Sequence, residues 1–529
     1  MFKTRNIGLS VLCILFILSC SDKEKVADEN SINDFEFLEI TIPEIREKLD
    51  EGELSVVDLT QAYIERIEAI DQAGPQLNSV IMINPDALLI AQELDDELQA
   101  GKIRGPLHGI PILLKDNIDT KDKMPTTAGS RALENSFPLS DSWVTKKLRA
   151  AGAVILGKAN LSEWANFRGE LSSSGWSGLV GQTKNPYILD RNPCGSSSGS
   201  GVSVSANLCM IAIGTETNGS IVCPANNNGV VGIKPTVGLI SRSGIIPISY
   251  TQDTAGPMAR TLTDAVIALG SLTGVDSADE KTTASLGKSL TDYTPYLKTE
   301  GLKNKRIGIY KRPLGRHYKV DTLFYQAVEF IKSQGAEVIE IDNITKSNVG
   351  GHSFQVMLYE YKEGLNAYFK SLGPDAEIKD LEELIEFNKK DSIELLYHDQ
   401  KYLEMANEKS GLDDQEYTEA LNKLLIGSRE DGLDSVMNAH QLDAIIAPTG
   451  GPAWKTDLVN GDSFHLGSSS PAARSGYPNI TVPMGFINEL PVGISFFGRA
   501  WSEPLLIEIA YAYEQGTMHR KAPKYIPTD

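Results

Sequence analysis

The chain has 529 residues, with 70 acidic against 50 basic side chains, so its formal net charge at pH 7 is −20. This acidic balance argues against nucleic acid as a partner, because phosphates favour a basic protein face. A chain of this length buries a large core, and by length alone it is compatible with two or three domains.

The first twenty residues have the pattern of a targeting segment. A positively charged start precedes an apolar run at 7–18 that is too short to span a bilayer. The run leads into the letters ILSC, which resemble a bacterial lipobox. We expect 1–19 to be a lipoprotein signal peptide and Cys20 to be the lipid anchor of an exported, periplasmic or cell-surface protein. An ordinary signal peptide with an incidental cysteine is the alternative.

Polar and charged residues follow, so 20–37 is expected to be the acylated cysteine and a flexible tether. The main domain is expected to span 38–520, with a short tail at 521–529. Helix-start patterns, T-x-x-E and S-x-x-D, occur at Thr41 and Ser55. A third helix is expected at 85–98.

Helical and buried-strand patterns then alternate, first at 140–160 and again at 305–342. The alternation returns at the end of the chain, where PVGISFFG precedes a helical pattern. It predicts crossover units and a mixed or parallel sheet flanked by helices. The region 275–300 is polar and is expected to be a loop, and 352–437 is helical and charged.

Lys115 follows the apolar letters IPILL, which predict a buried strand that ends at this lysine. Burial disfavours an ammonium and lowers its pKa, so a lysine in this place can act as a neutral base. A lysine that extends from a strand end into solvent is ordinarily commoner.

The region 192–260 holds two turns rich in glycine and serine, GSSSGSG and GTETNGS, around the apolar segment VSVSANLCMIAI. A flexible linker is the usual interpretation of such glycine and serine composition, but this apolar segment indicates packed, shaped turns. The letters GSSSG also fit the nucleophile elbow of other hydrolases. That motif needs a preceding strand, and the residues before Gly195 have the pattern of a turn.

Five cysteines occur, at 13, 20, 194, 209 and 223, and three of them lie in the expected domain. An odd number gives no complete disulfide framework, so we expect Cys194 and Cys223 to be buried packing residues. The seven histidines form no close pair, so no metal site is predicted. We expect no cofactor.

The segments around Lys115, Ser196 and Ser220, with GVVGIKPTVGLISRSGIIP, DAIIAPT and GYPNITVP, resemble the amidase signature family over about 38–518. The resemblance implies one large α/β domain with a mixed, mostly parallel sheet, and a Ser–Ser–Lys triad. By the family's pattern Ser220 is the nucleophile, Ser196 bridges it to the base Lys115, and a cis peptide bond follows Gly195.

The family's oxyanion donors correspond to the backbone N–H groups of Thr217, Asn218, Gly219 and Ser220. Such donors meet the charge that develops only in the transition state. The family's variable region corresponds to 352–437 and borders the substrate entrance.

Three positions depart from the commonest family pattern: Asn218 and Cys194 replace glycines, and Val222 replaces an arginine that pairs with the acid at 216. With these departures the chain is similar to the peptide amidases, which remove the C-terminal amide of peptides. The expected activity is hydrolysis of a carboxamide to acid and ammonia. Alternatives are a broad aliphatic or aryl amidase, a transamidase subunit, or a non-catalytic surface lipoprotein of the same fold.

Overall fold

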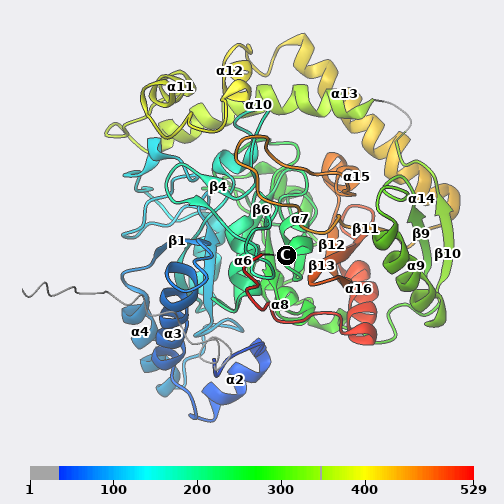
Figure 1. The fold of residues 1–529 in the computed structure, drawn as a ribbon, viewed down its shortest axis with the longest axis horizontal. Coiled ribbons are helices and arrows are strands. Elements are labelled where there is room, and N and C mark those ends of the chain that lie inside the picture. Colours follow the sequence, from blue (N-terminus) through cyan, green and yellow to red (C-terminus); the bar gives the residue numbers. More distant parts are fainter. Residues whose placement is uncertain (1–34, 346–347, 529) are drawn as a thin grey trace, which may run out of the picture.

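The structure is a computed structural model that describes residues 35–345 and 348–528 (Figure 1). The expected signal peptide, Cys20 and most of the tether lie outside the described residues. Within the described part of the chain, no helix is long and apolar enough to cross a membrane.

An eleven-stranded mixed sheet runs through the middle of the molecule, in the order β1-β3-β2-β6-β8-β7-β12-β13-β11-β9-β10. Its strands are β1 (Val80–Ile83), β2 (Pro111–Lys115), β3 (Val154–Ala159), β6 (Ile211–Glu216), β7 (Val231–Lys234), β8 (Thr254–Ala259), β9 (Arg306–Tyr310), β10 (Glu337–Ile341), β11 (Ala444–Pro448), β12 (Asn479–Ile487) and β13 (Leu490–Phe497). A small hairpin of β4 (Trp176–Ser177) and β5 (Gly181–Gln182) stands apart.

The helices surround the sheet as expected for an α/β fold (Figure 1). They are α2 (Ile42–Asp50), α3 (Val56–Arg66), α4 (Ala87–Gln99), α5 (Trp143–Ala150), α6 (Ser198–Ser205), α7 (Val222–Asn227), α8 (Leu262–Leu272), α9 (Tyr318–Ser333), α10 (Val349–Ser371), α11 (Leu381–Lys390), α12 (Lys401–Asn407), α13 (Gln415–Ser428), α14 (Asp434–His440), α15 (Ser470–Ser475) and α16 (Glu503–Thr517).

Shorter turns of helix join these elements. They are the π turns Ile67–Gln72 and Arg429–Leu433, and the 3₁₀ turns Arg131–Leu133, Glu163–Asn166, Glu280–Ser285 and Thr294–Tyr296. The last two fall in 275–300, the region that the sequence predicts to be a loop.

The sheet pairs in parallel in two places, β3-β2-β6 and β11-β9-β10. Between them lie antiparallel pairs, from β6-β8 to β13-β11. The expected single α/β domain with a mixed sheet flanked by helices is confirmed, but antiparallel pairs are more numerous than parallel ones. One of these pairs has a local reason: β12 and β13 form a hairpin with only two residues between them, and a short connection of this kind joins antiparallel strands.

The predicted helix starts are confirmed at atomic detail. Thr41 and Glu44 form a capping box at α2, and the Ser55 side chain accepts a hydrogen bond from the N–H of Asp58 at α3. These contacts satisfy N–H groups that a helix N-terminus leaves unpaired. The expected helical character of 352–437 is also confirmed, and α10 to α13 lie together along the top of Figure 1.

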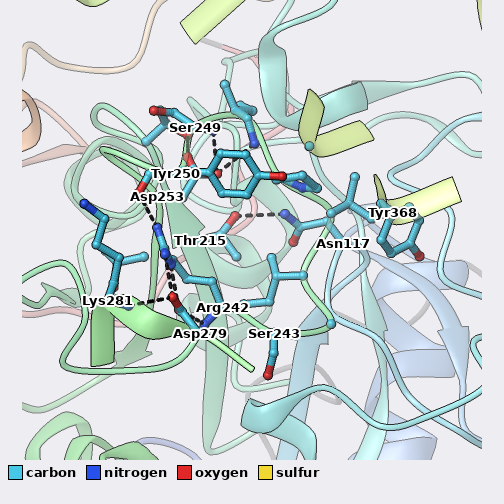
Figure 2. Close-up of a pocket in the computed structure, with 18 of the residues that line it drawn as sticks. Asn117, Thr215, Arg242, Ser243, Ser249, Tyr250, Asp253, Asp279, Lys281 and Tyr368 are labelled. Carbon is cyan, nitrogen blue, oxygen red and sulfur yellow. Dashed lines mark hydrogen bonds and ion pairs between the residues drawn. The ribbon is translucent and has the colours of Figure 1, made fainter. Parts of the chain in front are cut away.

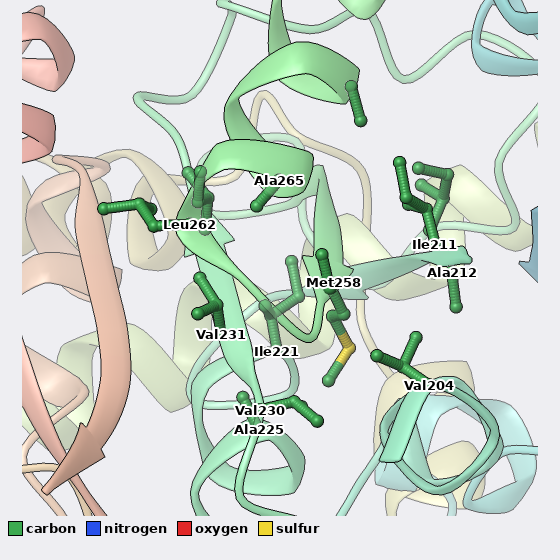
Figure 3. Close-up of a cluster of buried hydrophobic side chains, with 14 of the residues drawn as sticks. Val204, Ile211, Ala212, Ile221, Ala225, Val230, Val231, Met258, Leu262 and Ala265 are labelled. Atoms are coloured by element: carbon green, nitrogen blue, oxygen red, sulfur yellow. The ribbon is translucent and has the colours of Figure 1, made fainter. Parts of the chain in front are cut away.

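The core behind the two glycine- and serine-rich turns is dense and apolar. Figure 3 shows Val204 of α6 near Ile211 and Ala212 of β6, while Leu262 and Ala265 come from α8. All five side chains are buried. The turns therefore rest on a rigid base rather than on a flexible linker.

The packed region is longer than the expected 38–520 at both ends. Phe35 and Phe37 make ring contacts with Tyr63, and Phe37 is buried. At the other end, the N–H of Tyr525 donates to the carbonyl of Pro186, and Ile526 forms a bridge with Ile188.

Candidate active site

Lys115 is the last residue of β2, as predicted, and its side chain is fully buried. Its Nζ lies 2.7 Å from Ser196 Oγ and 2.8 Å from Thr215 Oγ1, with the carbonyl oxygen of Thr215 at 3.3 Å. Burial lowers the pKa of Lys115 to about 7, although Asp253 and Glu216 oppose this shift through their charge. An amine of this pKa is substantially neutral at physiological pH.

Two other buried lysines show how different the surroundings of Lys115 are. Lys158 lies 3.6 Å from a carboxylate oxygen of Asp116 and donates to Ile118 O and Thr126 Oγ1. Lys234 donates to the carbonyl oxygens of Pro235 and Tyr477. Of these three buried lysines, Lys115 is the one whose Nζ lies at hydrogen-bond distance from a serine hydroxyl.

Ser196 sits in a turn that leads into α6 and is fully buried. The peptide bond between Gly195 and Ser196 is cis, in agreement with the expectation from the family. A Cβ atom built on Gly195 would lie 2.1 Å from Ser162 Oγ, so a larger residue here would force the Ser162 side chain to move. The carbonyl of Ser196 accepts a hydrogen bond from the N–H of Ser162 at 3.0 Å.

Ser220 lies in the second turn, directly after β6, and is partly exposed. The N–H of Ser197 donates to the carbonyl of Ser220 at 3.1 Å, so the two turns contact each other beside Ser196. Glu216 accepts from the N–H groups of Ile221 and Val222, and these two backbone groups take the place of the arginine partner common in the family.

The backbone N–H groups from Thr217 to Ser220 have a distinct property. In the described part of the chain, none of the four donates a hydrogen bond to another protein group. Gly219 has a φ of +90°, a conformation that glycine adopts without steric cost. This segment can therefore present unpaired donors to a substrate oxygen, as the oxyanion prediction requires.

The segments that flank the two turns are also covalently joined. Cys194 and Cys223 form a disulfide with Cα atoms 5.9 Å apart. The prediction that both are free packing residues is therefore wrong. Cys194 precedes the first turn and Cys223 lies at the start of α7, after the second turn; these segments meet only through the tertiary fold, and spacing along the chain does not reveal such a pairing. Cys209 is free and buried, as expected of a packing residue.

A cavity of about 550 Å³ opens beside the second of these turns, at Thr215 to Thr217 (Figure 2). Thr215 and Thr217 line it from the β6 side, and Tyr368 of α10 lines it from the other side. Figure 2 shows Arg242 paired with Asp279 at one end of the cavity. The volume lies in the range usual for pockets that hold small organic ligands, and the helical region borders the cavity as expected.

Three residues near the site were not predicted to have a role in it. Thr215 Oγ1 contacts Lys115 Nζ and accepts a hydrogen bond from Asn117 Nδ2 at 3.1 Å. Asp253 accepts from Thr217 Oγ1 at 2.6 Å. Thr215 and Asn117 lie within the segments that carry the triad residues, so closer reading of these segments could have identified them. Asp253 lies in QDT, which has no recognisable pattern.

No cluster of histidine, cysteine, aspartate and glutamate suited to a metal ion occurs in residues 35–345 and 348–528. The fold and the site together define the class, an enzyme that hydrolyses amide C–N bonds, and the comparisons with known proteins agree. The Amidase family model matches residues 58–507, so the chain belongs to the amidase family, within which it has the amidase signature fold.

Relatives of known name cover nearly the whole chain. A probable amidase of Arabidopsis thaliana is 42% identical, over 99% of this chain and 100% of its own length. The native peptide amidase of Stenotrophomonas maltophilia has a similar structure, with a TM-score of 0.89 and 48% identity over 92% of this chain and 99% of its own. One subunit of the glutamyl-tRNA(Gln) amidotransferase of Microcystis aeruginosa is 33% identical, over 92% of this chain and 99% of its own length.

Proposed function

We propose that this amidase uses Ser220 as nucleophile, Ser196 as proton relay and Lys115 as base, and that it acts on the C-terminal amides of peptides. The contact between Lys115 Nζ and Ser196 Oγ at 2.7 Å carries the proposal. A neutral amine donates its two N–H groups to the oxygens of Thr215, and its lone pair then faces the hydroxyl of Ser196. This is the arrangement that a base needs in order to take a proton.

The reaction proceeds in two halves. Ser220 Oγ attacks the amide carbon while its proton passes through Ser196 Oγ to Lys115 Nζ. The carbonyl oxygen becomes an oxyanion, which the N–H groups of the turn from Thr217 to Ser220 stabilise. The C–N bond then breaks, the proton returns through Ser196 to the leaving nitrogen, and ammonia departs. Water attacks the acyl-enzyme by the same relay and releases the acid.

Peptide amides are the favoured substrates because the chain is similar to a peptide amidase over most of both lengths. The departures from the commonest family pattern, a cysteine before Gly195 and a valine after Ile221, resemble the same subgroup. A cavity of about 550 Å³ exceeds what a small aliphatic amide fills, and this volume is consistent with part of a peptide lying beside the turns.

We also propose that the enzyme is an exported lipoprotein held at a membrane by acylated Cys20. The proposal rests on the apolar run that ends at this cysteine, and the residues concerned lie outside those the structure describes. The net charge of −20 gives no general attraction to anionic lipid, so the anchor would supply the attachment.

Mass spectrometry of reaction mixtures tests the substrate class. The purified enzyme is incubated with peptide amides, with the matching peptide acids, and with simple aliphatic and aryl amides. We expect the peptide amides to be converted to acids with release of ammonia, and the peptide acids to remain intact. Turnover of the simple amides alone would favour the broad amidase. No turnover of any amide, with the wild type folded, would favour the non-catalytic lipoprotein.

A further inference from the structure

Glu360, in the middle of α10, is a buried carboxylate with a full set of partners. One oxygen accepts from Ser249 Oγ and from the N–H of Thr251, the latter at 3.0 Å. The other accepts from Thr251 Oγ1 and from Tyr417 OH, the latter at 2.8 Å. Three of these four donors belong to the segment 249–251, so Glu360 fixes that segment against α10.

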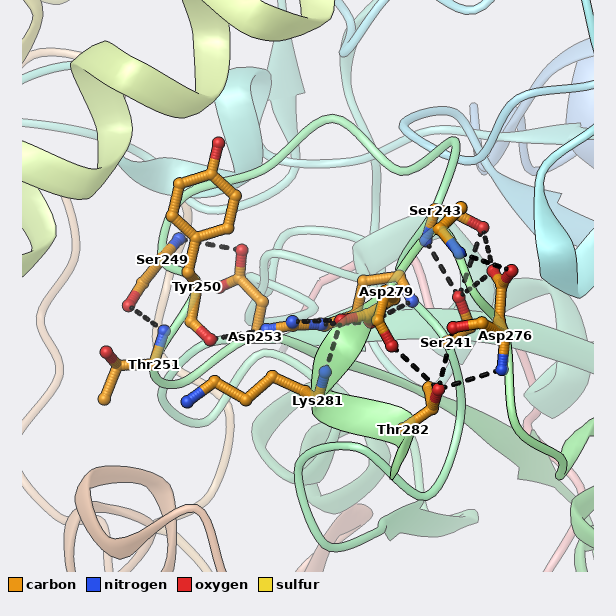
Figure 4. Close-up of polar contacts among 12 residues, drawn as sticks. Ser241, Ser243, Ser249, Tyr250, Thr251, Asp253, Asp276, Asp279, Lys281 and Thr282 are labelled. Atoms are coloured by element: carbon orange, nitrogen blue, oxygen red, sulfur yellow. Dashed lines mark hydrogen bonds and ion pairs between the residues drawn. The ribbon is translucent and has the colours of Figure 1, made fainter. Parts of the chain in front are cut away.

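The segment held by Glu360 continues to the proposed oxyanion turn. The N–H groups of Ile248 and Ser249 donate to one oxygen of Asp253, and the other oxygen of Asp253 accepts from Thr217 Oγ1 at 2.6 Å. Figure 4 shows Ser249, Thr251 and Asp253 close together in this arrangement. Asp253 therefore connects the segment held by α10 to the first residue of the turn.

A second connection runs parallel to the first. Gln252 Nε2 lies 3.4 Å from the carbonyl oxygen of Thr217, and Gln252 Oε1 accepts from Ser353 Oγ at 2.6 Å. Ser353 and Glu360 are seven residues apart on α10, so they share one face of the helix. Helix α10 thus reaches the side chain of Thr217 through the partly buried Asp253, and its carbonyl through the buried Gln252.

We propose that Glu360 is a positioning residue of this amidase, which aligns the oxyanion donors by holding 249–253 against Thr217. The inference rests on the proposed function, because it assumes that the turn from Thr217 to Ser220 receives the oxyanion. It gives the helical region 349–437 a role in turnover beyond bordering the cavity.

The network needs a carboxylate at this position for a simple reason. The N–H of Thr251 can only donate, and each oxygen of a carboxylate accepts. A glutamine in place of Glu360 can keep its amide oxygen toward the N–H of Thr251, but its NH₂ group then donates toward Thr251 Oγ1 and Tyr417 OH. These two hydroxyls would have to accept instead of donate, and their own protons would lose a buried acceptor. Relief of that conflict moves the segment 249–253, and the turn shifts with it. A small displacement of these donors lowers the rate, because they stabilise the transition state only at hydrogen-bond distance from the position that the oxyanion takes.

The test compares Glu360→Gln with wild type in kcat and KM for a peptide amide. It also measures inhibition by the matching peptide aldehyde, whose serine adduct carries an oxyanion, and by the peptide acid. We expect kcat to fall about tenfold or more and aldehyde affinity to fall in parallel. KM and inhibition by the acid should stay within about twofold, since they report ground-state binding.

Glu503→Gln is the matched control. Glu503 is also a buried glutamate, and it accepts a hydrogen bond from the N–H of Thr236, outside the network. The same exchange there should reduce stability without lowering kcat. An equal fall in kcat for both variants, or a rise in KM at constant kcat for Glu360→Gln, would overturn the proposal.

Two further variants keep the test decisive if Glu360→Gln does not fold. Ser249→Ala removes one hydrogen-bond donor to Glu360, and Thr217→Val removes the hydroxyl that donates to Asp253. Each variant should lower kcat at constant KM. Where Glu360→Gln folds, its effect should be less than additive with that of Thr217→Val, since both act through one network. Full additivity, or single variants with unchanged kcat, would contradict the proposal. The failure of the proposed function is recognised separately, because wild type would then not turn over the peptide amide.

Discussion

At the scale of single residues, the surroundings of Lys115 decide what the site can do. In the described part of the chain, its Nζ bonds to hydroxyl and carbonyl oxygens and to no carboxylate. None of these contacting groups carries a full negative charge, which would be needed to stabilise the protonated form of a buried lysine. The lysine pKa therefore falls to about 7, and the neutral amine becomes available as a base.

This pKa sets the pH dependence of the reaction. Below about pH 7 Lys115 is protonated and cannot accept the proton of Ser196, so kcat/KM should fall about tenfold for each further pH unit. Above about pH 7 the rate should level off. A pH series of kcat/KM on the peptide amide measures this profile.

Lys115→Arg is the matched variant, since arginine keeps a long cationic side chain that stays protonated. It should lower kcat about 10²- to 10⁴-fold at every pH, measured on protein that remains folded. The free energy of unfolding should also fall, because a permanent cation is then buried without a carboxylate partner. A wild-type profile that is flat from pH 5 to 9, or an arginine variant of nearly normal rate, would remove Lys115 from the mechanism.

At the residue scale, the family pattern named positions whose contacts the structure describes, while their catalytic roles stay predictions. Lys115 Nζ lies 2.7 Å from Ser196 Oγ, and the turn of Ser196 contacts that of Ser220 through the backbone of Ser197. The network of Glu360, Gln252 and Asp253 could not be predicted, because it joins residues about a hundred positions apart. Their side chains meet through the packing of α10, and no short sequence pattern records such contacts.

At the scale of elements, α6 approaches its neighbours more closely than a side chain would allow. A Cβ atom on Gly199 would lie 2.3 Å from the carbonyl oxygen of Ser79 and 2.5 Å from the backbone nitrogen of Asn160. Backbone atoms cannot rotate away, so α6 itself would have to move. Since Ser196 lies in the turn that leads into α6, a shift of the helix disturbs the contact with Lys115.

Gly199→Ala should therefore lower the free energy of unfolding by about 1–3 kcal/mol and reduce kcat. Gly351, in the first turn of α10, is the control, because among the described residues its Cβ would meet only Asn348 Nδ2, at 3.6 Å. Gly351→Ala should be neutral, or stabilise the helix by up to about 1 kcal/mol. Urea unfolding measures the free energy of unfolding of both variants. Equal values for the two would contradict the close approach of α6 to the backbone of Ser79 and Asn160.

The disulfide between Cys194 and Cys223 joins the segment before α6 to the start of α7, with a sequence separation of 29 residues. A closed loop of this length stabilises the folded state by about 3–4 kcal/mol in the chain-entropy model. The double variant Cys194→Ala, Cys223→Ala should lose about this much free energy of unfolding.

Urea unfolding with and without a thiol reductant measures the effect. Wild type should be destabilised by the reductant, while the double variant should not respond to it. Cys209→Ala is the control, since Cys209 is free, and it should keep the response of wild type. Unfolding of wild type that is insensitive to reductant would show that the bond does not form.

At the scale of the whole molecule, the sequence predicted the class of fold but not the order of the strands. Alternating helical and strand patterns indicated an α/β domain, and the structure confirms one. The antiparallel centre was not predicted, because strand order depends on which elements pack together. Neighbours such as β7 and β12 lie more than two hundred residues apart in the chain.

The lipid anchor is also a property of the whole molecule. Expressed in a bacterium that processes lipoproteins, the wild type should partition with membranes and incorporate labelled fatty acid. Cys20→Ser should abolish the label and leave the enzyme unattached or unprocessed, while amide hydrolysis by the domain is retained. Wild type that is soluble and unlabelled would contradict the anchor.

The choice of nucleophile is the central claim, and one measurement tests it most directly. A fluorophosphonate probe reacts with an activated serine, and peptide mapping of the labelled enzyme identifies the modified residue. The adduct should lie on Ser220, and Ser220→Ala should lose both labelling and turnover. Ser196→Ala should weaken both severely and leave any slow label on Ser220, while Ser197→Ala and Ser198→Ala should be milder. An adduct on the fragment that holds Ser196 to Ser198, with Ser220 unmodified, would contradict the assignment.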